Sequence, residues 1–218
     1  MFGRAAGRVR ELQVAIVPGN GKVMRQMLAR TMLLAPALCA SGFASGAPLP
    51  QSVRRLLPPG FAVIASARSD PAPGRVFYFV AAEARARGAR APVRPLLLFR
   101  IGKGGRAELA ARNDRVIFRS DDGGYNGCDP FEGRGITAKG AYGTVEQGIA
   151  CGAHWTDYVT FRFEPRLKGY VFDNWRTQSW SMNPTPAPNA EALVSDGQKI
   201  VRSNGRTVSF AKWSRPAN

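Results

Sequence analysis

The pattern of hydrophobic and polar positions predicts a protein made mainly of short β-strands. Residues 155–163 alternate most clearly, with Trp155 and Val159 on one face and Tyr158 and Arg162 on the other. A period of two is typical of a strand that has one buried and one solvated face. We therefore assign Trp155 to the core and expect Tyr158 and Arg162 at the surface.

Other apolar runs are short and rich in β-branched and aromatic residues, which favour strands. Turns rich in glycine and proline separate them. The expected strands are residues 61–65, 76–80, 96–101, 107–110, 116–118, 136–138, 143–146, 155–163, 169–172 and 206–210. Residues 81–89 are a weak helical candidate, and residues 183–198 are expected to form a loop. This spacing predicts a single, mainly β domain with little helix, built as an antiparallel sandwich, a curled sheet or a barrel.

Residues 24–47 have the order of segments that is typical of a secretory signal peptide. A short basic stretch precedes the apolar run 31–40, and Ser45 and Ala47 supply small residues before a cleavage site. The apolar run is shorter than the roughly 20 residues that a membrane-spanning helix needs. A buried N-terminal helix is the alternative. We expect cleavage after Ala47 and no transmembrane segment elsewhere in the chain.

Cleavage at this point divides the chain into four parts. Residues 1–23 are interpreted as an over-extended gene start, and residues 24–47 as the signal peptide. Residues 48–60 then lead into a β-rich domain of residues 61–218. The 218-residue chain has the length of one ordinary domain plus a leader. Such a protein is expected in the periplasm or outside the cell.

The chain contains three cysteines, and Cys39 lies within the predicted signal peptide. Cys128 and Cys151 remain, and two cysteines in an exported protein predict one disulfide. Two free thiols in a cytosolic protein are the alternative. These cysteines have no spacing typical of zinc ligands, so we expect neither a metal nor a cofactor.

The chain is strongly basic, with 31 Lys and Arg against 15 Asp and Glu and a formal net charge of +16. This balance favours polyanionic partners. The arginines are scattered, so an arginine-rich surface without a specific partner is the alternative. Export would separate the protein from most nucleic acid. We therefore expect an anionic component of the cell envelope, or a protein, as the partner.

Aromatic and cationic residues recur along the later strands: Trp155, Tyr158, Tyr170, Trp175 and Trp180, with Arg162 and Arg176. Such residues suit glycans or anionic polymers. The core must use part of this set, because the same strands need an inner face. Tyr158, Arg162, Tyr170 and Arg176 are the expected binding face.

Four carboxylates, Asp121, Asp122, Asp129 and Glu132, lie in a glycine-rich segment. They suggest either a site for a hard cation such as Ca²⁺ or ordinary turn chemistry, in which Asp caps its own backbone. His154, the single histidine, is a candidate general base. No nucleophile motif accompanies it, so no catalytic residue is assigned.

A series of motifs resembles a family of exported bacterial proteins of unassigned function. The resemblance covers roughly residues 60–175 and is carried by LLLFR at 96–100, NDRVI at 113–117, Gly123-Gly124, DPFEG at 129–133, ITAKG at 136–140, Trp155 and TFRF at 160–163. Members of that family often have an Asp-rich loop after the first strand. Residues 68–71 contain a single acid at that place, so no calcium site is carried over. The resemblance implies export and a β fold.

These features predict an exported β-rich protein that acts as a non-enzymatic binding or envelope-associated module. The alternative is a hydrolase of cell-wall or glycan substrates that uses the carboxylates of residues 121–132. Such an enzyme needs two acids about 5–10 Å apart in a cleft.

Overall fold

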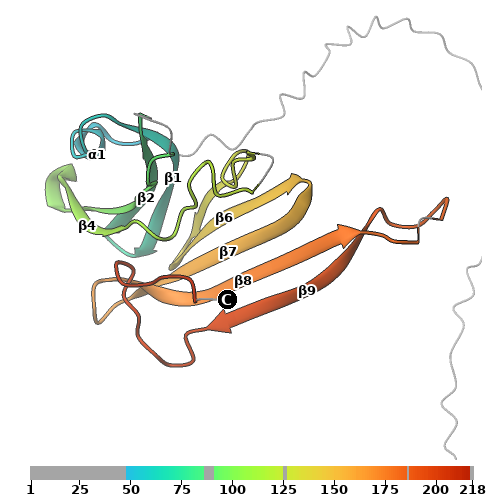
Figure 1. The fold of residues 1–218 in the computed structure, drawn as a ribbon. Helices are drawn as coiled ribbons and strands as arrows, with labels where there is room; N and C mark the ends of the chain where they lie inside the picture. Colours follow the sequence, from blue (N-terminus) through green and yellow to red (C-terminus); the bar gives the residue numbers. More distant parts are fainter. Residues whose placement is uncertain (1–47, 86–90, 125–126, 186, 217–218) are drawn as a thin grey trace, which may run out of the picture. The chain divides into compact units, whose positions relative to one another are not determined.

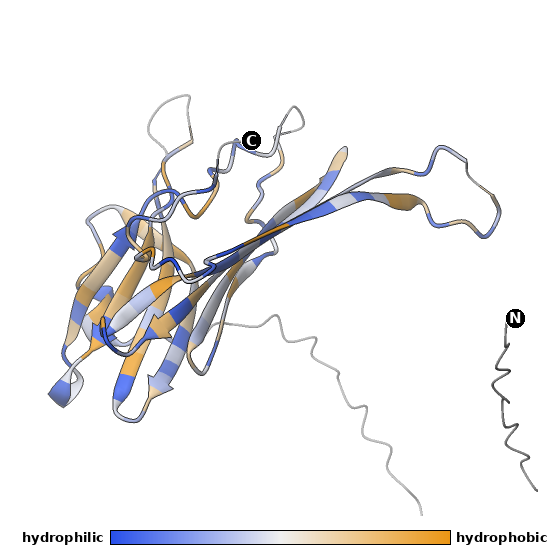
Figure 2. Cartoon of the chain, turned by 90° about the horizontal axis from the view of Figure 1, so that it is seen from below, coloured by the Kyte–Doolittle hydropathy of each residue, from blue (hydrophilic) through white to orange (hydrophobic). Residues whose placement is uncertain are grey.

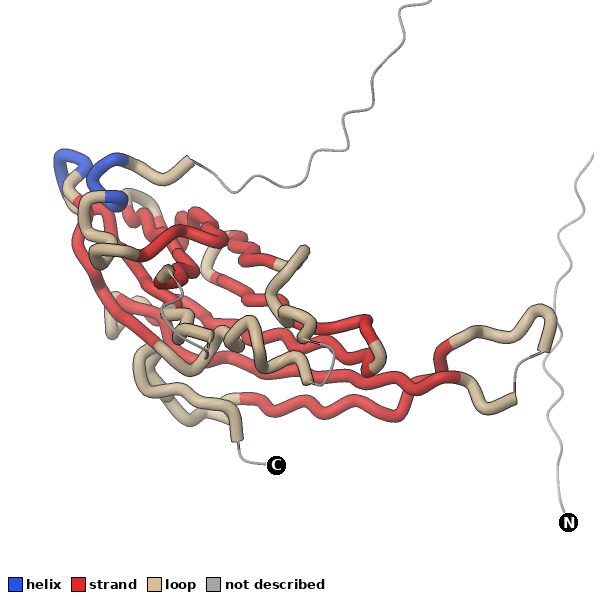
Figure 3. Tube along the Cα trace, turned by 45° about the horizontal axis from the view of Figure 1, so that its top comes forward, coloured by secondary structure: helices blue, strands red, loops and turns tan. Residues whose placement is uncertain are grey.

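The structure is a computed structural model that describes residues 48–85, 91–124, 127–185 and 187–216. The regular secondary structure of the described residues is almost entirely antiparallel strand with very little helix, which confirms the predicted mainly β fold (Figure 3). The predicted signal peptide and the residues before it lie outside the described residues. Among the helices of the described part, none has the length and apolar character needed to cross a membrane.

The strands form two sheets in which neighbours along the chain are also neighbours in space (Figure 1). Sheet A contains β1 Phe61–Ala72, β2 Arg75–Ala84, β3 Leu96–Ile101 and β4 Ala107–Asn113. Sheet B contains β5 Gly135–Lys139, β6 Tyr142–Cys151, β7 Ala153–Glu164, β8 Gly169–Met182 and β9 Leu193–Arg202. Two short helical segments complete the set: α1 Gln51–Arg54 and the 3-10 turn η1 Lys103–Gly105. Both sheets are therefore antiparallel meanders.

The two sheets pack face to face around an aromatic core. The ring centroids of Phe79 on β2 and Tyr170 on β8 are 4.7 Å apart, and those of Phe77 and Phe163 are 5.6 Å apart. Gly143 on β6 faces the Phe79 ring, which occupies the space that a side chain would need. Of the three architectures predicted, this is the sandwich.

Sheet A is covered on both faces, which explains why β2 and β3 are unbroken apolar runs. Phe79 faces sheet B, whereas its neighbours Tyr78 and Val80 pack in a second cluster with Leu49 and Val53 of the N-terminal segment. The described residues provide no comparable cover for the outer face of sheet B. Figure 2 shows many hydrophilic positions along the β8–β9 hairpin.

The C-terminal segment, residues 203–216, completes the core without forming a strand. Phe210 and Trp213 are buried, and the Phe210 ring lies 4.8 Å from that of Phe161. Asn113 Nδ2 donates hydrogen bonds to the carbonyl oxygens of Phe210 and Trp213 at 2.6 and 2.9 Å. These bonds fasten the segment to the end of β4.

Two predicted elements at the ends of strands are wrong. β2 continues to Ala84, so the helical candidate 81–89 begins as strand; its residues 86–90 lie outside the described residues. β9 begins at Leu193, inside the predicted loop 183–198. Because β9 is an edge strand with mostly exposed side chains, it lacks an apolar pattern that would reveal it.

Two predicted strands are also absent from the described structure. Residues 116–118 are largely buried, but side chains satisfy their backbone: Gln147 Oε1 accepts from Phe118 N at 2.7 Å. Residues 206–210 contribute one isolated bridge, between Ser209 and Val171. Both segments are hydrophobic because they pack into the core. Strands and buried loops share this property, so hydrophobicity alone did not distinguish them.

Candidate functional site

The carboxylates of residues 121–132 do not converge on a cation site. Asp122 accepts a hydrogen bond from the backbone N–H of Arg119 at 2.8 Å, which caps a turn. Asp121 accepts a hydrogen bond at 3.3 Å from the backbone N–H of Ala91, which lies between β2 and β3. Glu132 is exposed. Across the described residues, no group of three or more His, Cys, Asp and Glu side chains could hold a metal ion.

Asp129, the fourth member of the set, belongs to a buried ion-pair network. The Arg94 guanidinium, which is 3 % exposed, donates to both Asp129 oxygens at 2.5 and 2.6 Å and to Glu83 Oε1 at 2.7 Å. Burial alone would raise the pKa of Asp129. The hydrogen bonds from Arg94 and from the Phe131 N–H outweigh burial, so this pKa lies below its usual value. Asp129 is therefore committed to a structural ion pair.

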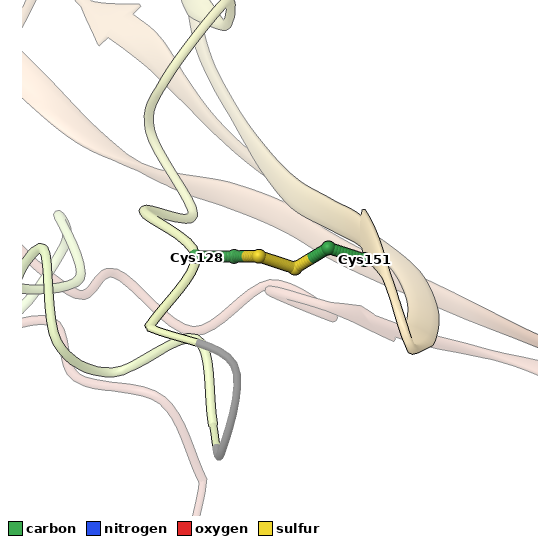
Figure 4. Close-up of a disulfide and its surroundings, with 2 residues drawn as sticks. All are labelled: Cys128 and Cys151. Atoms are coloured by element: carbon green, nitrogen blue, oxygen red, sulfur yellow. A yellow bond between two sulfur atoms is a disulfide. The ribbon is translucent and has the colours of Figure 1, made fainter.

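Cys128 and Cys151 lie at disulfide distance, as predicted, with Cα atoms 6.6 Å apart (Figure 4). The pair joins the turn-rich loop before β5 to the end of β6. Closing a loop of 23 residues stabilises the fold by about 3 kcal/mol in the chain-entropy model. The pair also constrains the β6–β7 hairpin. His154 follows in this hairpin and is the first residue of β7 on the face turned away from sheet A.

A second buried network surrounds Asp157, the polar residue that interrupts the inner face of β7. Trp175 Nε1 donates to Asp157 Oδ2, and Arg215 Nη2 donates to Asp157 Oδ1 at 2.7 Å. The Arg215 guanidinium also lies 3.9 Å from the centroid of the Phe118 ring. No buried side-chain nitrogen or oxygen of the described residues lacks a partner. The buried polar side chains of the described residues are therefore satisfied within the fold.

His154 lies on β7 opposite Ala150 of β6 and Trp180 of β8. Within the described part of the chain, no carboxylate or hydroxyl forms a hydrogen bond with its ring. The structure thus does not assemble a general base and nucleophile around His154.

Tyr158, Arg162 and Arg176 share the outer face of sheet B, which is the face turned away from sheet A. Tyr158 lies opposite Arg176 on the neighbouring strand, and both alternate with buried residues of the inner face. Trp155 is on the inner side, with its ring 5.4 Å from that of Phe118, but it is only partly buried and is not a member of either core cluster, contrary to its assignment to the core. The alternation of β7 therefore places Tyr158 and Arg162 as expected.

Tyr170 does not belong to this face, and its assignment to the binding face is wrong. It is 3 % exposed, lies opposite Phe163, and its hydroxyl is 2.5 Å from Ser69 Oγ. A β-bulge at Asp173 inserts one extra residue into β8, which turns Tyr170 to the side opposite Arg176. Burial raises the pKa of Tyr170 to about 12.

A groove of about 400 Å³ lies on the outer face between β8 and β9. Asn174 lies opposite Arg202, and Arg176 lies opposite Ile200, and all four residues line the groove. The two arginines are thus diagonal neighbours on one sheet face, a separation that long side chains can bridge. The Arg176 guanidinium is turned toward Gln178, so a rotation of this side chain toward Arg202 would let both groups hold one anion.

The charge balance of this groove is positive. Its single carboxylate, Asp173, accepts from Asn174 Nδ2 at 2.8 Å and lies 3.6 Å from Arg162 Nε. Among the described residues, no acid lies within ion-pair distance of Arg176 or Arg202. Arg176 instead donates to Gln178 Oε1 at 3.3 Å. An anion bound here would therefore meet two arginines that are not neutralised by the protein.

Sequence analysis identified Arg176 but missed Asn174, Ile200 and Arg202. Ile200 and Arg202 were missed because β9 was not predicted. The sequence at 199–202, in which two β-branched residues stand between a lysine and an arginine, is the signal that could have indicated an exposed strand.

Comparison of the chain with protein-family models, with curated proteins and with solved structures gives no match.

Proposed function

We propose that the protein is an exported binding module that holds an anionic ligand on the outer face of sheet B. The observation that carries the proposal is the groove between β8 and β9, which Arg176 and Arg202 both line without an acidic partner among the described residues. Paired arginines bind carboxylates, phosphates and sulfates through several charge-assisted hydrogen bonds. Residues 48–218 keep 25 of the 31 Lys and Arg and 14 of the 15 Asp and Glu, and their net charge of +11 would attract the same class of ligand.

Two features support export as the setting of this activity. The predicted signal peptide ends at Ala47, and Cys128 and Cys151 lie at disulfide distance. Disulfides persist in oxidising compartments such as the periplasm or the exterior of the cell. An anionic component of the envelope is therefore the partner that we propose.

The alternative function, a hydrolase built on residues 121–132, has less support. Asp129 is held by Arg94, and Asp122 caps a turn. A carboxyl pair for glycoside hydrolysis needs one member with a raised pKa to act as the acid. The pKa of Asp129 is instead lowered.

Binding of the purified protein to an immobilised polyanion, measured over a range of salt concentrations, tests the proposal. We expect affinity to fall steeply with salt, and the double variant Arg176→Gln/Arg202→Gln to reduce the slope by roughly one per lost contact. Arg68→Gln/Arg112→Gln removes the same charge from sheet A and is the matched control. Equal losses from both double variants would mean that net charge, and not the groove, determines binding.

Export is tested separately by the N-terminus of the protein recovered from an expressing bacterium. We expect mass spectrometry to find Pro48 as the first residue, in the extracytoplasmic fraction. An N-terminus upstream of residue 30 would refute the cleavage.

A further inference from the structure

A second hollow lies on the outer face of sheet B, around Trp180 of β8. It is a shallow, open hollow of about 570 Å³, lined by Trp180 of β8, His154 of β7, Ala150 of β6 and Leu193 of β9. Trp180 is partly exposed, so its indole is available to a ligand. A concave site of this size with aromatic walls is typical of small-molecule or sugar binding.

The charges around the Trp180 hollow differ from those of the arginine groove. Arg134, which lines the hollow, is paired with Glu146 at 3.0 Å, and Glu191 adds an exposed carboxylate. The hollow therefore offers an anionic group no lysine or arginine that is not already paired, and charge is not what it would recognise. The electron-rich face of an indole instead suits the C–H groups of a sugar ring, and the polar rim suits hydroxyl groups.

Both hollows open on the same face and the same strand. Arg176, Gln178 and Trp180 alternate outward along β8 with no bulge relative to β7 between them. Arg176 and Trp180 are four residues apart, which corresponds to about 13 Å along a strand. Between them lies a row of hydrogen-bonding side chains formed by Thr156, Gln178 and Gln198. A ligand that used both hollows would be longer than one sugar ring.

We infer that the ligand is a linear acidic polysaccharide that runs along β8, an inference that rests on the proposed function of this face. One sugar ring packs on Trp180, hydroxyl groups meet the row at Gln178, and a carboxylate of a later ring binds Arg176 and Arg202. The polar row between the hollows does not resemble the apolar centre of a protein interface. Repeated sugar units match the alternation of anion, hydroxyl and ring contacts.

The test is a series of oligogalacturonates, from the monosaccharide to chains of eight residues, titrated into the purified full-length protein by calorimetry. We expect affinity to rise with chain length until the chain spans both hollows, and then to level off. Trp180→Ala should weaken binding of the long chains by about fivefold to tenfold, the effect of losing one aromatic anchor, and leave the monosaccharide unchanged.

Three further variants keep the result interpretable. His154→Ala alters the same hollow independently and should act in the same direction, whereas Trp180→Phe retains a ring and should retain most of the affinity. Tyr142→Ala removes an exposed aromatic residue from the same face, outside both hollows, and should have no effect.

The outcomes separate this inference from the proposed function. If the monosaccharide bound as tightly as the long chains, or if Trp180→Ala and Tyr142→Ala had equal effects, the inference that a polysaccharide runs along β8 would be overturned. The arginine groove would remain the proposed anion site if Arg176→Gln/Arg202→Gln abolished binding. Failure of every oligogalacturonate to bind would overturn the polysaccharide inference, whereas the arginine groove would fail if Arg176→Gln/Arg202→Gln left the binding of the immobilised polyanion unchanged. If an oligothymidylate of equal charge bound more tightly than the oligogalacturonates and depended on Trp180, the ligand of this face would be single-stranded nucleic acid and not a polysaccharide.

Discussion

Arg94 joins carboxylates from two distant parts of the chain, Glu83 at the end of β2 and Asp129 in the turn-rich loop. Its guanidinium is almost completely withdrawn from water, and the pair with Asp129 is bidentate. Removing one partner of a buried pair leaves the other without compensation, which costs far more than the pair contributes to stability.

We expect Arg94→Ala to lower the free energy of unfolding by about 3 kcal/mol, measured by urea denaturation. Arg112→Ala is the control, because its pair with Asp114 is exposed and such pairs contribute at most about 1 kcal/mol. Similar losses in the two variants would contradict the structural role of Arg94.

Tyr170 gives the molecule a predicted loss of stability at high pH. Burial raises its folded-state pKa to about 12, above the value of about 10 for an unfolded chain. The corresponding stabilisation is complete below pH 10 and is lost as the pH rises from about 10 to 12, up to about 2 kcal/mol. We expect Tyr170→Phe to flatten the pH dependence of unfolding in this range. The exposed Tyr142→Phe should leave it unchanged, and equal slopes in all three proteins would refute the argument.

At the scale of elements, the contact between the sheets depends on a glycine in β6. A Cβ added at Gly143 would approach the Phe79 ring more closely than van der Waals contact allows, and that ring is fully buried. We expect Gly143→Ala to destabilise the protein by about 1–3 kcal/mol through overpacking. Gly135→Ala in β5 meets nothing within 4 Å and should change stability by less than about 0.5 kcal/mol. Thermal melts of both variants distinguish a close sheet contact from a loose one.

The same elements show what the sequence could and could not predict. β7 was predictable because one buried and one solvated face impose a period of two. The two-sided cover of β2 produces an apolar run that favours a strand but hides its partners. The position of Tyr170 could not be derived, because the bulge at Asp173 arises from pairing with β7 and leaves no mark in the hydrophobic pattern. The buried partners of Arg94 likewise depend on the folded chain.

At the scale of the whole molecule, the two sheets differ in how their faces are covered. Sheet A is covered on one face by sheet B and on the other by the N-terminal segment with Val53. The outer face of sheet B has no such cover from the described residues, and it carries the arginine groove and the Trp180 hollow. We therefore interpret sheet A as the scaffold and sheet B as the binding surface.

The most direct test of this account is a map of backbone amide chemical shifts by NMR as an oligogalacturonate is added to the purified protein. The account predicts that the largest changes follow β7, β8 and β9, from Asn174 to Trp180 and from Leu193 to Arg202. Sheet A should remain largely unchanged. Changes centred on β1–β4 or on residues 91–124, with little effect at Arg176 and Arg202, would contradict the assignment of the outer face of sheet B as the binding surface.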